Sequence, residues 1–413
     1  MKTLIQNIKT IVQVTAKPKE KVCGKDMSIL PCLDNAWISI ENGLISGFRE
    51  MKDIPAKAHF DEVIEANGRL VFPSWCDSHT HIVYAGSREG EFVDRIRGLS
   101  YEEIAKKGGG ILNSAEKLNK TSEDELFESA SARLKEITHY GTGAVEIKSG
   151  YGLSLEGEIK MLRVIKRLKQ HSPLTIKASF LGAHAVPAKY KQNRQEYIDL
   201  IINEMLPVIG KEKLADYCDV FCDRGFFTPD ETDAILKAGW KHGLQPKIHA
   251  NELDYSGGIQ VGVKNKALSV DHLEFTGDKE IAALLLSATM PTLLPSTAFF
   301  LGLHYPPARK MIDAGLPIAL ASDYNPGSSP SGRMSFIISL ACVKLKMLPE
   351  EAINAATINS AYAMGVGATH GSISIGKKAS LFITKPISNY SLIPYSFGSD
   401  LIETVMIEGK VQE

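Results

Sequence analysis

Two histidines separated by one residue follow a short apolar stretch near the start of the chain. His79 and His81 come shortly after the segment 70–72 (LVF). In an extended strand, side chains at positions i and i+2 point to the same side, so both imidazoles are expected to face one point. Imidazole nitrogens bind zinc, iron and similar transition-metal ions. Because such pairs also arise by chance, this pair predicts a metal site only if other strands supply further ligands.

Further histidines and acidic residues follow other apolar segments in the same way. The polar residues at these segment ends are His184, His249, Glu252, Asp271, His272 and Asp323. Taken singly, a histidine there is most simply a hydrogen-bonded residue at the edge of the core. Five of the eleven histidines at such ends, together with acidic residues, instead indicate a site for metal-dependent hydrolysis.

The elements that must position these residues alternate between apolar and amphipathic segments. Eight segments are expected to form strands: 70–72, 143–147, 175–181, 218–222, 246–249, 267–272, 288–294 and 317–323. Stretches with helical character stand between several of them, at 123 onward, 156–169 and 229–243. Strand–helix repeats over roughly 300 residues are typical of an α/β fold, the (β/α)8 TIM-type barrel, whose catalytic residues follow the carboxyl ends of the strands.

Both ends of the chain have the pattern of β-structure. Segments 36–40 and 44–48 flank the turn Glu41-Asn42-Gly43, which predicts a hairpin. Further strands are expected at 61–68, 372–375, 380–384 and 402–407. We therefore expect residues 1–68 plus 371–413 to form one small β-sandwich domain built from both termini. Residues 69–370 are expected to form the barrel domain.

The composition argues against several classes of protein. The 413 residues are 44% hydrophobic and 23% charged, with a formal net charge of -1, which is typical of a soluble globular protein. This balance argues against a nucleic-acid partner and against binding to an anionic membrane. No apolar stretch approaches the ~20 residues of a membrane span, and the N-terminus lacks a signal-peptide core, so we expect a cytoplasmic protein. The six cysteines form no CxxC pair, which is typical of reduced thiols.

Three longer motifs make the pattern specific. They are residues 146–153 (EIKSGYGL), 180–184 (FLGAH) and 322–328 (SDYNPGS). With the segment 73–81, the strand-end histidines and the aspartate at 323, the chain resembles the amidohydrolase superfamily. Within that superfamily, the three motifs resemble the imidazolonepropionase family, and the likeness covers essentially the whole chain. The resemblance implies a (β/α)8 barrel with a metal ion at its mouth.

The resemblance also implies the metal and its ligands. One zinc or iron ion per chain is expected, bound by His79, His81, His249 and Asp323. Relatives with two ions carry a carboxylated lysine on the fourth strand, whereas segment 219–223 (DVFCD) has none, which predicts a single ion. Lys148 is expected on the second strand, in an ion pair with Glu146 rather than in catalysis.

Three residues are implied to take part in the reaction: Glu252, His272 and Asp323. Glu252 is expected to take a proton from the attacking water and to give one to the departing ring nitrogen. His272 is expected to polarise the carbonyl or to hold the water, positioned by Asp271 or by Asp323.

The substrate is expected to carry a carboxylate. Arg88 lies just beyond the two histidines, and its planar guanidinium suits a carboxylate, although a solvated surface arginine is the alternative. The resemblance points to further substrate contacts: Tyr101, Tyr151, His184, Glu252, Asn325, Gly327 and Ser328. It also favours a homodimer.

The expected reaction is hydrolysis of 4-imidazolone-5-propionate to N-formimidoyl-L-glutamate in histidine degradation, by a metal-activated water. One alternative is a related mononuclear amidohydrolase that deaminates a purine or pyrimidine ring. A base-binding pocket has less need of a carboxylate clamp, so Arg88 and the loop 149–152 (SGYG) argue against it. A non-catalytic relative is the second alternative, but such proteins usually lose ligands or proton-transfer residues that this chain retains.

Overall fold

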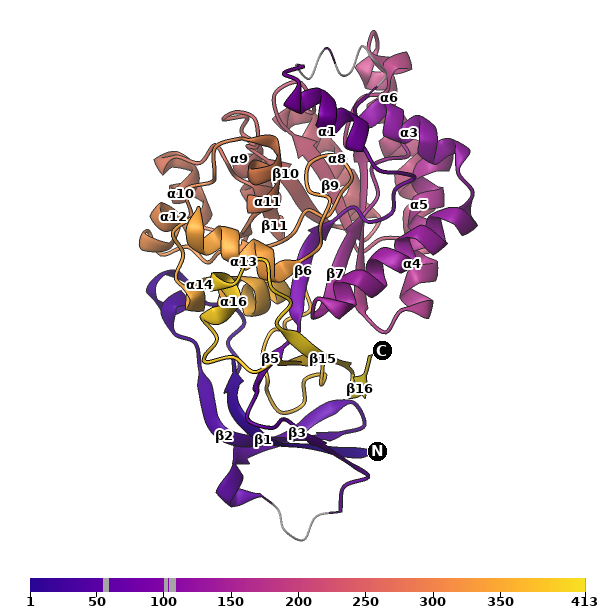
Figure 1. The fold of residues 1–413 in the computed structure, drawn as a ribbon. Helices are drawn as coiled ribbons and strands as arrows, with labels where there is room; N and C mark the ends of the chain where they lie inside the picture. The colour runs from indigo at the N-terminus through magenta and orange to yellow at the C-terminus, as the bar shows by residue number, and fades with distance from the viewer. Residues whose placement is uncertain (55–58, 100–102, 104–108, 413) are drawn as a thin grey trace.

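The computed structural model describes residues 1–54, 59–99, 103 and 109–412. Within these residues, two sheets of eight strands each organise the molecule (Figure 1). One sheet is parallel and is surrounded by helices. The other is built from both ends of the chain, so the two termini lie on the same side of the barrel.

The parallel sheet runs in chain order. Its strands are β6 (Trp75–Thr80), β7 (Thr142–Lys148), β8 (Thr175–Ala183), β9 (Tyr217–Cys222), β10 (Gln245–Ala250), β11 (Ser269–His272), β12 (Met290–Leu293) and β13 (Ala319–Leu320). The Asp323 N–H donates to the His79 carbonyl at 2.9 Å, and the His81 N–H donates to the Tyr324 carbonyl at 2.9 Å. These bonds join the segment after β13 to β6, so the sheet forms the predicted (β/α)8 barrel.

The first barrel strand differs from the prediction. Leu70–Pro73 forms β5, which pairs with β1 (Lys2–Val12) and β14 (Leu381–Thr384) in the sheet of the termini. The prediction that 70–72 opens the barrel was therefore wrong, and β6 takes that place. All residues of β5 and of β6 are buried, so apolar character alone does not distinguish a strand of one sheet from a strand of the other. The other seven predicted segments overlap β7 to β13.

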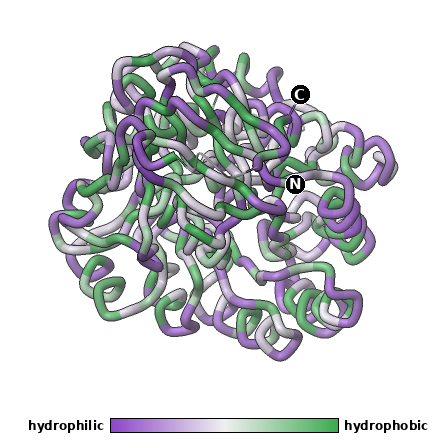
Figure 2. Tube along the Cα trace, turned by 90° about the horizontal axis from the view of Figure 1, so that it is seen from below, coloured by the Kyte–Doolittle hydropathy of each residue, from purple (hydrophilic) through white to green (hydrophobic). Residues whose placement is uncertain are grey.

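Helices cover the outside of the barrel. They are α1 (Glu89–Ile96), α3 (Ile111–Lys120), α4 (Glu123–His139), α5 (Leu155–His171), α6 (Arg194–Leu200), α7 (Leu206–Glu212), α8 (Pro229–Lys241), α9 (Gly258–Lys264), α10 (Asp278–Leu285), α11 (Pro295–Leu301), α12 (Ala308–Asp313), α13 (Met334–Val343), α14 (Pro349–Asn354), α15 (Ser360–Ala363) and α16 (Leu392–Tyr395). The three predicted helices are confirmed as α4, α5 and α8. Viewed from below, helical turns lie around the centre, with many hydrophilic residues on their outer side (Figure 2).

The second sheet joins both ends of the chain. Its order is β16-β15-β14-β5-β1-β2-β3, and β4 pairs with β1. The strands not yet given are β2 (Cys32–Glu41), β3 (Leu44–Glu50), β4 (Glu62–Glu65), β15 (Ile402–Ile407) and β16 (Lys410–Val411). The predicted hairpin is confirmed as β2 and β3, whereas segment 372–375 makes only an isolated bridge from Ile373 to Val14. A separate apolar core that includes Ile5, Ile38 and Leu381 packs within this sheet. The domain bounds at residues 68 and 371 stay a prediction.

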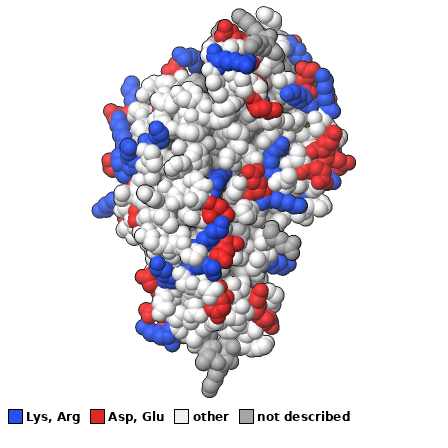
Figure 3. All heavy atoms as spheres, in the orientation of Figure 1, with Lys and Arg blue, Asp and Glu red and all other residues white. Residues whose placement is uncertain are grey.

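The surface carries charges of both signs. On the face drawn in Figure 3, lysine and arginine are interspersed with aspartate and glutamate, in agreement with the formal net charge of -1. Among the described helices, none has the length and apolar character that crossing a membrane requires.

Candidate active site

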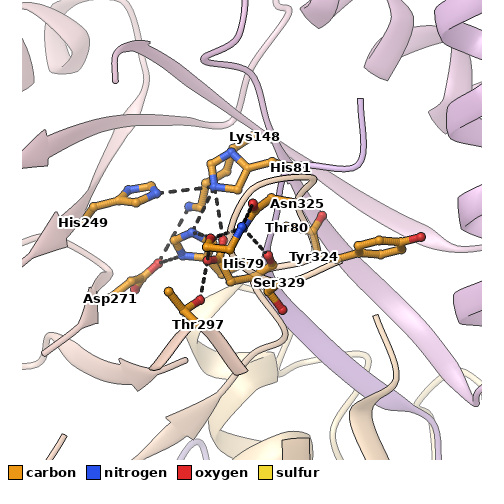
Figure 4. Close-up of polar contacts among 12 residues, drawn as sticks. His79, Thr80, His81, Lys148, His249, Asp271, Thr297, Tyr324, Asn325 and Ser329 are labelled. Carbon is orange, nitrogen blue, oxygen red and sulfur yellow. Dashed lines mark hydrogen bonds and ion pairs between the residues drawn. The ribbon is translucent and has the colours of Figure 1, made fainter. Parts of the chain in front are cut away.

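Three histidines converge at the carboxyl end of the barrel strands. The Nε2 atom of His81 lies 3.2 Å from Nε2 of His79 and 3.5 Å from Nε2 of His249 (Figure 4). All three side chains are buried. Within the part of the chain that the structure describes, this is the one group of three or more potential metal-binding side chains with all its ligand atoms within 4.8 Å of one another.

Two aspartates set the orientation of two of these imidazoles. Asp271 Oδ2 lies 2.6 Å from His79 Nδ1, and Asp219 Oδ1 lies 3.1 Å from His249 Nδ1. Because a carboxylate accepts a hydrogen bond, each Nδ1 carries the proton and each Nε2 presents its lone pair to the common point. Lone pairs facing one another at this spacing fit a bound cation, and carboxylate-supported imidazoles are typical of metal centres.

The protein environment keeps the imidazoles of His79 and His81 neutral. Burial lowers the pKa of His79 and of His81 well below the ordinary value, and the neighbouring ammonium of Lys148 adds to the effect. A metal ion binds the neutral form of imidazole, so the ligands are available without loss of a proton near neutral pH.

A carboxylate completes the group. Asp323 Oδ1 lies 3.5 Å from Nε2 of both His79 and His81. Its Oδ2 accepts a hydrogen bond from Thr297 Oγ1 at 2.6 Å, which leaves Oδ1 directed at the imidazoles. The four residues predicted to bind the metal are thus brought together. Thr297 was not predicted, because a threonine in α11 carries no signal in the sequence.

His272 was predicted to be positioned by Asp271 or by Asp323, and the carboxylates beside its Nδ1 are those of Glu252 and Glu274. Asp271 contacts His79 and not His272, so its predicted role in positioning His272 was wrong. Instead, His272 Nδ1 lies 3.7 Å from Glu252 Oε2 and 4.0 Å from Glu274 Oε2. Adjacent residues of a strand point to different sides, and the positive φ of 84° at His272 turns the chain as β11 ends. Being next to each other in the sequence therefore does not bring Asp271 and His272 into contact.

Glu252, which is partly exposed, and Glu274, which is buried, both lie beside His272. Burial raises the pKa of Glu252 to about 8, with Asp323 and Asp223 adding to the shift. Burial also raises the pKa of Glu274 well above its ordinary value, and Glu252 adds to it. Both carboxyl oxygens of Glu274 lack a hydrogen-bond partner among the described residues. A carboxyl group in this setting holds a proton near neutral pH, as a general acid must.

A cavity of about 570 Å³ opens over the histidines. Its lining includes His81, His249, His272 and Asp323, and the predicted substrate contacts Arg88, Tyr151, His184, Glu252, Asn325, Gly327 and Ser328. Tyr101, the remaining predicted contact, lies outside the described residues.

Arg88 belongs to the wall of this cavity. Its side chain is only 11% exposed, so the alternative of a solvated surface arginine is excluded. The Nη2 atom lies 2.5 Å from Glu91 Oε2. A Cβ atom at Gly327 would lie 2.2 Å from Nη1 of Arg88, so a side chain at this position would displace the guanidinium. Arg95 also reaches this loop, through a hydrogen bond of 3.1 Å from Nη1 to the Gly327 carbonyl, and was not predicted.

Comparisons with known proteins agree with this geometry. The model of the amidohydrolase family matches residues 70–412. The chain is 59% identical to the imidazolonepropionase of Flavobacterium johnsoniae over 100% of both chains. It is 42% identical to the imidazolonepropionase of Alkaliphilus oremlandii, over 98% of this chain and 97% of the relative. The chain belongs to the imidazolonepropionase family of amidohydrolases.

Solved structures of more distant proteins share the fold. Guanine deaminase of Escherichia coli has a TM-score of 0.74 at 13% identity, over 100% of this chain and 98% of that chain. An adenosine deaminase from Xanthomonas campestris, with bound zinc, has a TM-score of 0.70 at 14% identity, over 99% of this chain and 92% of that chain. At such identities the likeness shows the barrel fold alone. Membership of the imidazolonepropionase family makes the chain a hydrolase that acts on carbon–nitrogen bonds.

In this member of the imidazolonepropionase family, one glutamate holds the loop 149–152. Glu158 of α5 accepts hydrogen bonds from the backbone N–H groups of Gly150, Gly152 and Leu153, at 3.0, 2.8 and 2.9 Å. The Gly150 carbonyl lies 3.0 Å from His184 Nδ1. Burial lowers the pKa of His184 to about 3, so the ring is neutral, with Nδ1–H donating to Gly150 and Nε2 left as an acceptor.

Several residues that build the site were not predicted from the sequence: Thr297, Glu158, Arg95, Glu274 and the partner role of Asp219. For two of these residues, the position in the sequence indicated a place near the site. Asp219 lies in a predicted barrel strand, and Glu274 stands two residues after His272. Nothing in the sequence indicates this for Glu158, because its position in a helix does not show that it accepts hydrogen bonds from the loop.

Proposed function

We propose that this chain hydrolyses the ring carbon–nitrogen bond of 4-imidazolone-5-propionate and forms N-formimidoyl-L-glutamate, a step of histidine degradation. The observation that supports this most directly is a single cavity lined both by the histidines His81 and His249 and by the guanidinium of Arg88. The substrate has two matching parts, a cyclic amide and a propionate carboxylate. A guanidinium in a largely apolar cavity suits the second part because its fork binds both carboxylate oxygens.

We propose that one zinc or iron ion is bound by His79, His81, His249 and Asp323. The convergence of their ligand atoms, and the aspartates behind two of the imidazoles, support this assignment. When bound, such an ion supplies a water molecule whose pKa is lowered toward neutrality. Imidazole and carboxylate ligands accept either metal, so elemental analysis decides between zinc and iron.

Glu252 and His272 carry the proton chemistry in this proposal. Glu252 takes a proton from the attacking water and gives it to the ring nitrogen as the carbon–nitrogen bond breaks, while His272 donates a hydrogen bond to the carbonyl oxygen. Their positions in the lining of the cavity support these roles. The raised pKa of Glu252 suits the second part of its role, the donation of a proton to the ring nitrogen. Asp323 is also assigned to the reaction, because its carboxylate lies beside His79 and His81 and lines the same cavity as Glu252 and His272.

The substrate carboxylate is assigned to Arg88, and the ring to contacts from Tyr151, His184 and Ser328. The side chain of Asn325 acts on its own loop: Oδ1 accepts hydrogen bonds from the N–H groups of Gly327 and Ser328 at 2.7 and 2.8 Å. We therefore assign Asn325 and Gly327 to the shape of the loop that faces the substrate. Tyr101 stays a prediction, as do the homodimer and the cytoplasmic location.

The deaminase alternative has less support. The deaminases that share the fold are only 13–15% identical to this chain, whereas imidazolonepropionases reach 59%. The decisive experiment measures the metal content of the purified protein and follows ring opening through loss of the ultraviolet absorbance of imidazolone propionate. Guanine, adenine and cytosine serve as controls, with ammonia release as the signal. Ammonia release from a base, without opening of the imidazolone ring, would overturn the proposal.

A further inference from the structure

A buried lysine, Lys148, lies among three carboxylates near the three histidines of the candidate metal site. Lys148 Nζ lies 2.6 Å from Glu146 Oε1, 2.7 Å from Asp219 Oδ2 and 3.7 Å from Asp271 Oδ2. All four side chains are inaccessible to solvent. The ion pair with Glu146 was predicted and is present, but the contacts with Asp219 and Asp271 extend it. These two aspartates are the ones that hold His249 and His79. Figure 4 shows Asp271 beside His79.

We propose that Lys148 is a positioning residue of the metal centre, which fixes the two carboxylates that orient His79 and His249 and thereby sets the affinity of the site for its metal. The inference rests on the metal site proposed above and deepens it. Lys148 forms its hydrogen bonds with carboxylates and does not line the cavity, so its proposed action passes through Asp219 and Asp271.

The geometry gives each aspartate two partners on opposite sides. Asp219 accepts from Lys148 through Oδ2 and from His249 through Oδ1. Asp271 Oδ1 accepts from Ser269 Oγ at 2.5 Å, and its Oδ2 faces both His79 and Lys148. Without the ammonium, the two buried carboxylates would lose the cation that both of them contact, while Lys247 stays paired with Glu146. Removal of one partner of a buried ion pair is strongly unfavourable in a protein interior. Rotation of either carboxylate in response moves the imidazole that it holds.

A second buried lysine provides a matched control. Lys247 lies in β10, is likewise inaccessible to solvent, and also forms an ion pair with Glu146. Its other hydrogen bonds go to the carbonyl oxygens of Ser78 and Ala363, each at 3.2 Å. Replacement of Lys247 therefore removes a buried cation of the same network while the contacts of Asp219 stay in place.

The test compares Lys148→Met with Lys247→Met. Metal is removed from each folded protein, and zinc affinity is measured by competition with a chromogenic chelator. Residues that orient metal ligands typically change affinity by ~10- to 100-fold, and we expect a loss of this size for Lys148→Met and a change of less than about 3-fold for Lys247→Met. The visible spectrum of bound cobalt should change in Lys148→Met only. Unchanged affinity and spectrum in Lys148→Met, or an equal loss in Lys247→Met, overturns the inference.

If Lys148→Met fails to fold, the milder variant Lys148→Gln replaces it. A double-substitution cycle with Asp219→Asn provides a second test. If Lys148 acts through Asp219, adding the lysine substitution to Asp219→Asn should weaken zinc binding much less than it does in the wild-type background. Full additivity of the two losses contradicts the proposed path. Failure of the wild-type protein to bind any metal contradicts the proposed metal site itself, which separates the two claims.

Discussion

The backbone N–H of Asp323 donates a hydrogen bond of 2.9 Å to the carbonyl oxygen of His79. This bond connects the chain after the last barrel strand to the first barrel strand. It also places the Asp323 carboxylate 3.5 Å from His79 Nε2. Closure of the barrel and assembly of the candidate metal site are therefore one structural event, and the site exists only in the closed barrel.

Replacement of Glu252 by glutamine should abolish most turnover while the metal is retained. Glutamine keeps the size of the side chain but neither takes nor gives the proton, and a general acid–base group contributes typically ~10²–10⁴-fold to the rate. Steady-state kinetics and elemental analysis of the same preparation check this. Near-normal kcat in Glu252→Gln removes the residue from the mechanism.

Replacement of Arg88 by lysine should raise KM by about 10-fold or more, with little change in metal content. Lysine keeps the positive charge but lacks the planar fork that binds both carboxylate oxygens, and charged hydrogen bonds contribute ~1.5–3 kcal/mol each. Arg224→Lys is the matched control, because Arg224 is 73% exposed. Identical kinetics in Arg88→Lys and the wild type would refute the role in binding the carboxylate.

Removal of the metal should abolish activity and lower thermal stability together. A ligand that binds only the folded state stabilises it by RT ln(1 + [L]/Kd), about 4 kcal/mol when the free ion exceeds Kd 1,000-fold. Chelation followed by return of zinc or of iron, with activity and unfolding temperature measured at each step, also identifies the metal that restores turnover. A preparation that is fully active without a transition metal contradicts the assignment.

Replacement of Glu274 by glutamine should change how stability depends on pH. Burial raises the pKa of this carboxyl group well above its ordinary value, so the folded protein keeps a proton that the unfolded chain loses above about pH 4.3. Each further pH unit then costs the wild type up to ~1.4 kcal/mol of unfolding free energy, until the folded-state pKa is reached. Glutamine has no such proton, so Glu274→Gln should gain stability relative to the wild type as pH rises.

This gain is measured by urea unfolding of both metal-free proteins at about pH 5 and about pH 8, where the linkage relation predicts a widening difference. Parallel pH dependence of the two proteins shows that Glu274 is ionised in the folded state, contrary to the expectation.

Replacement of Glu158 by alanine should destabilise the protein and weaken substrate binding. Three backbone N–H groups of the loop after β7 lose their acceptor, and each buried unsatisfied donor costs ~1–3 kcal/mol. Glu156→Ala is the control, since Glu156 lies in the same helix and is exposed. We expect a lower free energy of unfolding and a higher KM in Glu158→Ala only; equal effects in both variants argue for a general effect on α5.

The sequence by itself determined which residue types are available and on which side of each strand they lie. Spacing along a strand fixes the direction of a side chain, so His79 and His81 were correctly expected to face one point, and seven of the barrel strands and the β2–β3 hairpin followed from apolar periodicity. The long motifs around Lys148, His184 and Asp323 were specific enough to indicate the family.

Only the tertiary structure decided which residues meet across strands. Asp271 reaches His79 and not its neighbour His272, Leu70–Pro73 pairs with the termini and not with the barrel, and Lys148 contacts two aspartates from other strands. Such contacts depend on strand register and on how the sheet closes, which are set by the packing of the whole chain. Local periodicity carries no information about either, and this is the physical reason why the ligand types were predictable and their supporting partners were not.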